Sequence, residues 1–193
     1  MNKLDISNWK FFYLGDKKYF KIYRAQGRIP SCPSINFFVR SPSMLPVVSS
    51  SKENNGITAF YEKEIEEWGK IYPPRIITIA NNGSIGESFF QPWEFCSTND
   101  VTICELVEKD LNEHIAFFLC SIIKMERFRY SWGRKWGLEE MRNSKILLPI
   151  NEKGEPDWLW MENYSKKIYG KVKKDILELL KSRERERERE SKN

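Results

Sequence analysis

The hydrophobic residues between positions 9 and 104 occur in short runs that Gly, Pro, Asn and Ser interrupt. Three of these runs lie at residues 37–39, 45–48 and 76–80. Short apolar runs bounded by turn-forming residues are typical of β-strands. This half of the chain is therefore predicted to form a β-sheet.

A different spacing begins at residue 110. Apolar residues recur there at intervals of three and four positions, which places them on one face of a helix. The pattern predicts a helix over residues 110–125, with Asp110 as its N-terminal cap. The residues of this face are Leu111, Ile115, Phe118, Ile122 and Met125.

A second, longer helix is predicted to begin at Asp157, after the turn at residues 151–156. Its apolar stripe is narrow, which favours packing against one other helix over burial in a globular core. Gly170 costs a helix about 1 kcal/mol relative to Ala, so contacts with a partner or with the rest of the chain must support it. The stripe consists of Met161, Ile168, Val172, Ile176 and Leu179.

The last part of the chain, residues 183–190, alternates strictly between Arg and Glu. In a helix this order places opposite charges three positions apart and like charges four positions apart, so their pair energies nearly cancel. We expect residues 183–193 to be a solvated and frayed low-complexity tail. The patterns together predict an α+β fold at residues 1–150, a long helix at residues 157–182 and this tail.

Composition narrows the class of protein only slightly. The 193 residues carry 32 Lys and Arg against 27 Asp and Glu, and a net charge of +5 does not indicate a partner. No apolar run is long enough to cross a membrane, and the N-terminus does not resemble a signal peptide. None of the four cysteines forms a Cys-x-x-Cys pair, so neither a zinc site nor disulfides are expected. These features predict a cytoplasmic protein in a reducing compartment, without a membrane partner.

Catalytic motifs are missing from the sequence. His114 is the only histidine, which argues against a His-based nuclease, a two-histidine metal site and a Ser/His triad. Residues 83–86 are too short for a dinucleotide-binding loop and lack the ending of a phosphate-binding P-loop. We therefore expect no enzyme activity, no metal and no cofactor. A small nuclease or nuclease fragment is one alternative, although Glu62, Glu64, Glu66 and Glu67 are too close together to be metal ligands on neighbouring strands.

A basic run at residues 127–135 has the character of a nucleic-acid contact, with four cations, three aromatic residues and no acid. In an extended conformation, the cations would alternate with the aromatic residues, which could then anchor the run. Arginine pairs well with phosphate oxygens and with the guanine edge. The alternative is an ordinary surface strand. The residues proposed to contact DNA are Arg127, Arg129, Tyr130, Arg134 and Lys135.

Two polar turns, at residues 49–56 and 81–84, are rich in Asn, Ser and Gly. Such residues can place amides near bases and backbone N–H groups near phosphates. Simple hairpin chemistry explains the same composition, because Asn-Gly is a common tight turn. The candidate DNA-facing residues of this group are Asn54, Asn55, Asn82, Ser84 and Gln91.

Six segments occur in an order that has the character of one family. They are residues 54–57; 77–86; 89–92 with Phe95; 99–101; 129–135; and 145–149 with 154–158 and Met161. Together, over residues 20–164, they resemble the target recognition domain of restriction-modification specificity subunits. The likeness is strongest to the type IIB BcgI-like specificity chain and more distant to type I subunits. An interaction module that does not bind DNA remains the other alternative.

The resemblance implies a twisted sheet with flanking helices that reads half of a split double-stranded DNA target. A long helix would follow, pairing antiparallel with its counterpart and docking an adenine methyltransferase or restriction subunit. That partner, not this chain, would bind S-adenosylmethionine. Such specificity subunits usually hold two recognition domains, whereas this sequence holds one. It is accordingly a half-subunit that forms a homodimer through the C-terminal helix, a truncated product, or one part of a larger system.

Overall fold

The computed structural model describes residues 4–27, 44–63, 70–107, 109–130 and 134–190, with side chains up to residue 187. The strand expected at residues 37–39, the acidic positions 64–67 and residues 131–133 of the basic run lie outside these ranges. The described strands are β1 (Trp9–Tyr13), β2 (Phe20–Arg24), β3 (Met44–Val48), β4 (Ile57–Glu62), β5 (Ile71–Tyr72), β6 (Ile76–Ala80), β7 (Ser88–Gln91), β8 (Phe95–Ser97), β9 (Val101–Leu106) and β10 (Lys145–Pro149).

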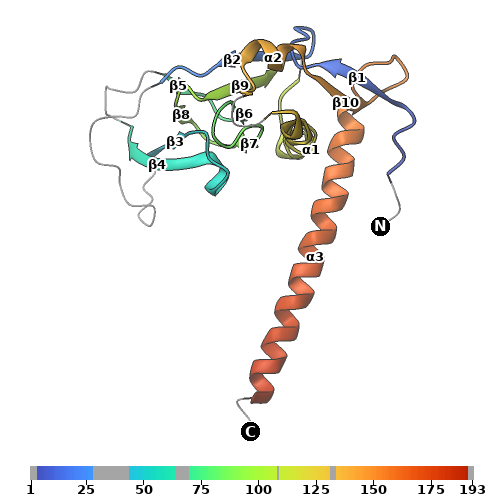
Figure 1. Cartoon of the computed structure of the whole chain (residues 1–193). Helices are drawn as coiled ribbons and strands as arrows, with labels where there is room; N and C mark the ends of the chain where they lie inside the picture. The colour runs from blue at the N-terminus through green and yellow to red at the C-terminus, as the bar shows by residue number, and fades with distance from the viewer. Residues whose placement is uncertain (1–3, 28–43, 64–69, 108, 131–133, 191–193) are drawn as a thin grey trace.

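The strands form two four-stranded sheets and one two-stranded sheet (Figure 1). One sheet has the antiparallel order β2-β9-β6-β7, and the second has the order β4-β3-β8-β5, in which β3 and β8 run parallel. The small sheet pairs β1 with β10. The runs at residues 45–48 and 76–80 lie within β3 and β6, so both strand predictions are confirmed.

The main hydrophobic core lies between the β2-β9-β6-β7 sheet and helix α1 (Glu113–Lys124). Leu111, Ile115 and Phe118 are buried in it, as the predicted helix face requires. The helix is capped by Asn112, whose side chain accepts a hydrogen bond from the N–H of Ile115 at 2.9 Å, and not by Asp110. Met125 is exposed because α1 ends at Lys124 and the chain continues as the 3₁₀ helix η2 (Met125–Arg129).

The C-terminal helix, α3 (Trp158–Glu190), begins where the sequence predicts it. The Asp157 carboxylate accepts a hydrogen bond from the N–H of Trp160 at 2.9 Å, which caps the first turn. Met161 is fully buried in the main core, and Trp160 packs edge-on against Phe118 of α1. The first two turns of α3 are therefore part of the globular core, and the assignment of Met161 to a partner-facing stripe is wrong.

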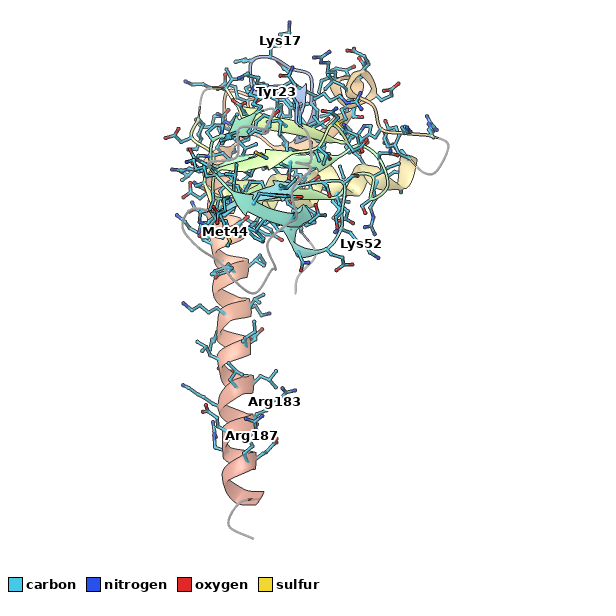
Figure 2. All side chains as sticks on the ribbon, turned by 90° about the vertical axis from the view of Figure 1, so that its left-hand side faces the viewer. Lys17, Tyr23, Met44, Lys52, Arg183 and Arg187 are labelled. Carbon is cyan, nitrogen blue, oxygen red and sulfur yellow. The ribbon has the colours of Figure 1, made fainter. Side chains whose placement is uncertain are left out.

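Beyond these first two turns, α3 extends far from the body of the molecule (Figure 1). The helix continues to Glu190, past the predicted end at residue 182, and the side chains up to Arg187 are exposed as expected. Arg183 and Arg187 lie near its far end (Figure 2). Once the packed first turns have nucleated the helix, adding a further residue to it costs little free energy, and Arg and Glu both favour helix.

The remaining described helices are short: η1 (Asn54–Gly56) precedes β4, and α2 (Leu138–Asn143) precedes β10. Trp136, just before α2, is completely buried and donates a hydrogen bond to Ser144 Oγ at 3.0 Å. In the parts of the chain that the structure describes, no helix combines the length and apolar character that a membrane span needs.

Candidate nucleic-acid interface

The first polar turn, residues 49–56, is held in an unusual backbone conformation. Asn54, Asn55 and Gly56 all have positive φ angles, of 49°, 60° and 77°, which asparagine and glycine tolerate better than other residues. Asn55 Nδ2 donates a hydrogen bond to the carbonyl of Phe90 at 2.9 Å. Asn55 is thus tied to β7, whereas the Asn54 side chain is exposed at the tip of the turn.

The second polar turn lies directly beside the first. We call residues 81–87, which join β6 to β7, the amide loop. Ser50 Oγ of the first turn donates a hydrogen bond to the carbonyl of Asn82 in the amide loop. Asn82 and Ser84 are partly exposed. The structure therefore brings together the two turns that the sequence proposes to face DNA, although 32 positions separate Ser50 from Asn82.

The amide loop contacts η2 on its other side. Gly86 has a φ of +79°, and a Cβ atom at this position would lie 2.8 Å from the Cβ of Arg127. Only glycine allows this close approach without a shift of the helix backbone. The first turn, the amide loop and the basic run are consequently three neighbours on one surface.

The basic run does not have the extended conformation assumed for it. Residues 125–129 form η2, so cations and aromatic residues do not alternate between two faces there. Phe128 is 77% exposed and anchors nothing. The run contains no acid in sequence, but Arg127 pairs with Glu87 at 2.9 Å and Arg129 with Glu126 at 3.4 Å.

Tyr130 is the aromatic anchor of the described part of the run. Its ring stacks on the buried Trp136, with 5.2 Å between ring centroids, and its hydroxyl lies 3.3 Å from Ser144 Oγ. The guanidinium of Arg134 lies 5.8 Å from the centre of the Tyr130 ring. Arg134 and Lys135 are both exposed, so their charges are available to a ligand.

Gln91 differs from the other candidates, because its side chain is only 2% exposed. Its Nε2 donates to the carbonyl of Asn55 and to Thr78 Oγ1, both at 3.0 Å. An amide whose donors are used inside the protein cannot read a base from this position. Gln91 fixes the first turn to β7, and we remove it from the candidate DNA contacts.

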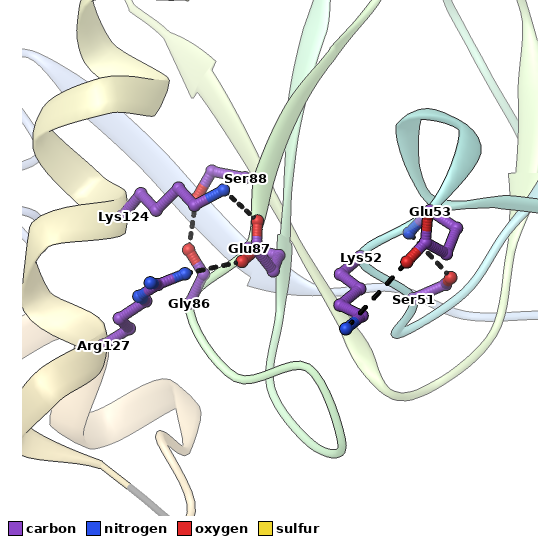
Figure 3. A network of polar contacts seen from close by, with 8 residues as sticks. All are labelled: Ser51, Lys52, Glu53, Gly86, Glu87, Ser88, Lys124 and Arg127. Carbon is purple, nitrogen blue, oxygen red and sulfur yellow. Dashed lines mark hydrogen bonds and ion pairs between the residues drawn. The ribbon is translucent and has the colours of Figure 1, made fainter.

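Two charged residues of this surface were missed in the sequence. Lys124 directly precedes the 3₁₀ helix that carries Arg127, and extending the basic run by one helical turn would have found it. Glu87 pairs with Lys124 at 2.5 Å as well as with Arg127 (Figure 3). Nothing in the sequence indicates this contact, because Glu87 and Arg127 are 40 positions apart.

The described residues offer little material for catalysis. No group of three or more His, Cys, Asp or Glu residues among them is arranged to hold a metal ion. Burial raises the pKa of the thiols of Cys96 and Cys104 to about 12, which keeps both thiols protonated and unreactive near neutral pH. The exposed and partly exposed groups on this surface are amides, hydroxyls and cations.

Comparison with known proteins gives a consistent result. A family model described as the type I restriction modification DNA specificity domain matches residues 6–180. The specificity subunit S.BcgI of a type II restriction enzyme from Heyndrickxia coagulans is 29% identical over 145 residues, which are 72% of this chain and 41% of that protein.

Solved structures show the same α+β fold. The HsdS subunit from Thermoanaerobacter tengcongensis has a TM-score of 0.54 and 18% identity, over 89% of this chain and 40% of that one. A chain from a structure of complex assembly and conformational transition in the type I R-M system has a TM-score of 0.56 and 17% identity, with the same coverage. The present chain thus spans about two fifths of the length of each of these proteins.

Proposed function

Since this chain belongs to the family of type I restriction-modification DNA specificity domains, we propose that it reads one part of a split DNA target for a methyltransferase partner. The chain itself performs no catalysis in this proposal. The observation that carries it is the convergence of the two polar turns and the basic run on one surface, from three separate parts of the sequence.

Two kinds of contact with DNA are proposed for this surface, one to bases and one to phosphates. Exposed amides and hydroxyls discriminate between bases, because asparagine can make two hydrogen bonds to adenine, and we assign this role to Asn54, Asn82 and Ser84. Cations hold phosphates and fix the position of the protein on the duplex, and this role falls to Arg127, Arg129, Arg134 and Lys135. Asn55 and Tyr130 attach these segments to the body of the protein, Asn55 through its hydrogen bond to Phe90 and Tyr130 through its stacking on Trp136.

The exposed part of α3 is the proposed site of assembly. Val172, Ile176 and Leu179 are each about half exposed, along one stripe of α3. An apolar groove of about 380 Å³ between α1 and α3 continues this stripe toward the body and includes Phe117 and Ile168. A long exposed stripe on a single helix favours association. We propose that it packs against a second copy in antiparallel orientation or against a methyltransferase helix.

The packing of the first turns of α3 bears on where the recognition domain ends. Because Met161, Trp160 and Tyr164 pack in or against the main core, we propose a recognition domain that ends near residue 164. The coupling helix then occupies the rest of α3, up to Glu190.

Selection from a pool of randomised duplex DNA tests this function. We expect the full chain, alone or with an adenine methyltransferase from the same kind of system, to enrich a defined partial sequence. Binding should weaken with salt, and changing Arg129, Arg134 and Lys135 together to Gln should reduce the salt slope by about one counterion per lost phosphate contact.

The matched control removes three cations elsewhere. Lys10 lies in β1 and Lys153 in the turn after β10, and Lys17 lies at the opposite end of the body from Lys52 of the first polar turn (Figure 2). Changing these three to Gln should leave the salt slope nearly unchanged. Enrichment of no sequence, with or without the partner, would contradict the proposed function. Equal slopes for the two triple variants would contradict the assignment of the basic run.

A further inference from the structure

Glu87 occupies a central place between the amide loop and the basic run. It is the last residue of the amide loop, where its N–H donates to the carbonyl of Ser84 at 3.1 Å and its carbonyl accepts from the N–H of Ala80 at 2.9 Å. Its carboxylate binds Arg127 Nη1 at 2.9 Å through Oε1 and Lys124 Nζ at 2.5 Å through Oε2 (Figure 3). One side chain therefore joins the loop to both α1 and η2.

This carboxylate is buried, whereas its two partners reach solvent. The Glu87 side chain is 9% exposed, against 44% for Lys124 and 55% for Arg127. A buried carboxylate needs its cationic partners, because an unpaired charge in the interior is strongly unfavourable. Yet a buried ion pair usually adds little net stability over an apolar replacement of similar size. The value of such a pair here is that it restricts geometry.

The backbone around Glu87 is restricted as well. Gly86 lies too close to Arg127 for any other residue, and its carbonyl accepts a hydrogen bond from Ser88 Oγ at 3.0 Å. At the other end of the loop, the Asn82 carbonyl accepts a hydrogen bond from Ser50. The side chains of Asn82 and Ser84 thus project from a loop that is held at both ends.

We propose that Glu87 is a positioning residue of the DNA interface, which sets the distance between the base-reading amide loop and the phosphate-binding Arg127. This inference rests on the proposed function. Phosphate contacts fix where a protein sits on the duplex, and base contacts succeed only if their side chains have the matching position. Glu87 connects the two sets through a single carboxylate.

A positioning role predicts two effects of opposite sign for Glu87→Gln. Removing a negative charge from a surface that faces phosphates should strengthen or maintain binding to random DNA. Loosening the amide loop should at the same time weaken discrimination between matched and mismatched sequences by about tenfold, the loss of one good base contact. An electrostatic role alone would strengthen binding to both kinds of DNA, and a folding defect would weaken both.

Glu53→Gln is the matched control. Glu53 lies in the neighbouring polar turn, its side chain is 73% exposed, and its carboxylate lies 4.0 Å from the ammonium of Lys52 (Figure 3). The substitution removes one negative charge from the same surface, as Glu87→Gln does, but it breaks no buried ion pair. We expect Glu53→Gln to bind all duplexes at least as tightly as the parent and to enrich the same sequence from the randomised pool.

Lys124→Gln keeps the test decisive if Glu87→Gln does not fold. This substitution removes the partner of Glu87 that α1 supplies, at a residue that is about half exposed. The four proposed phosphate contacts stay intact. We expect it to weaken discrimination between matched and mismatched sequences, as Glu87→Gln does. A parent chain that enriches a sequence, with variants of Glu87 and Lys124 that enrich it equally sharply, would overturn the positioning role alone. A parent chain that enriches nothing would overturn the proposed function instead.

Discussion

At the scale of single residues, chemically similar amides have different roles on this surface. Asn54 and Asn82 reach solvent from turns, whereas Gln91 turns its amide inward from β7. The difference follows from where the donors are used, since both hydrogen bonds donated by Gln91 Nε2 go to groups of the protein itself. Exposure, and not residue type, decides which amide is available to a base.

Replacing Gln91 and Ser84 by Ala tests this distinction. Gln91→Ala leaves the Asn55 carbonyl and Thr78 Oγ1 without this donor, and we expect the free energy of unfolding to fall by about 1–3 kcal/mol for each group left unsatisfied. Ser84→Ala should leave unfolding unchanged and alter the enriched DNA sequence. Urea unfolding followed by tryptophan fluorescence measures the first effect. Equal stability of the two variants would return Gln91 to the candidate DNA contacts.

At the scale of elements, α3 combines two parts with different surroundings. Its first turns pack on α1 and the sheet, where Trp160 stacks on Tyr164 with 5.0 Å between ring centroids. After Ile168, the side chains up to Arg187 are exposed. A single helix therefore begins in the core of one domain and ends with its side chains exposed.

Alanine substitutions at the two parts should differ in their cost. Met161→Ala removes a completely buried side chain, and such a change typically costs 2–5 kcal/mol, so we expect a loss of about that size. Val172→Ala changes a side chain that is 48% exposed and should cost about 0.5 kcal/mol or less in the isolated chain. The free energy of unfolding from urea titration distinguishes them. Similar losses would mean that the outer part of α3 also packs on its own domain.

At the scale of the whole molecule, the surface proposed for DNA recognition and the surface proposed for assembly are separate. The two polar turns and the basic run lie on the body, while the outer half of α3 extends away from it (Figure 1). Antiparallel pairing of two such helices would place two recognition domains at opposite ends of one assembly. Such an arrangement would match the proposed split DNA target.

Changing Val172, Ile176 and Leu179 together to Asp tests the assembly. Three charges in an apolar seam are strongly unfavourable, so we expect assembly and DNA-dependent methylation to fail while the domain stays folded. Changing Lys174, Glu178 and Lys181 to Asp, each two positions further along the helix, places the same side chains on the opposite face and serves as control. Light scattering of both variants, alone and with the methyltransferase, gives the answer. Normal assembly of the first variant would exclude this stripe as the interface.

Much of the fold is a local property, and the sequence alone was enough to predict it. The strands at residues 45–48 and 76–80 follow from short apolar runs bounded by turn-forming residues. The buried face of α1 and the start of α3 follow from the spacing of apolar residues, because that spacing indicates which face of a helix is buried. The family also follows from short segments in a fixed order.

Only the tertiary structure decided which groups meet. Spacing shows that Met161 lies on an apolar stripe, but not whether this stripe faces its own core or a partner. Composition shows that residues 127–135 contain no acid, but not that Glu87 reaches Arg127 from 40 positions away. In each case the outcome depends on contacts between distant parts of the chain. Such contacts leave no periodic trace in the sequence, because they are formed only when the elements pack together.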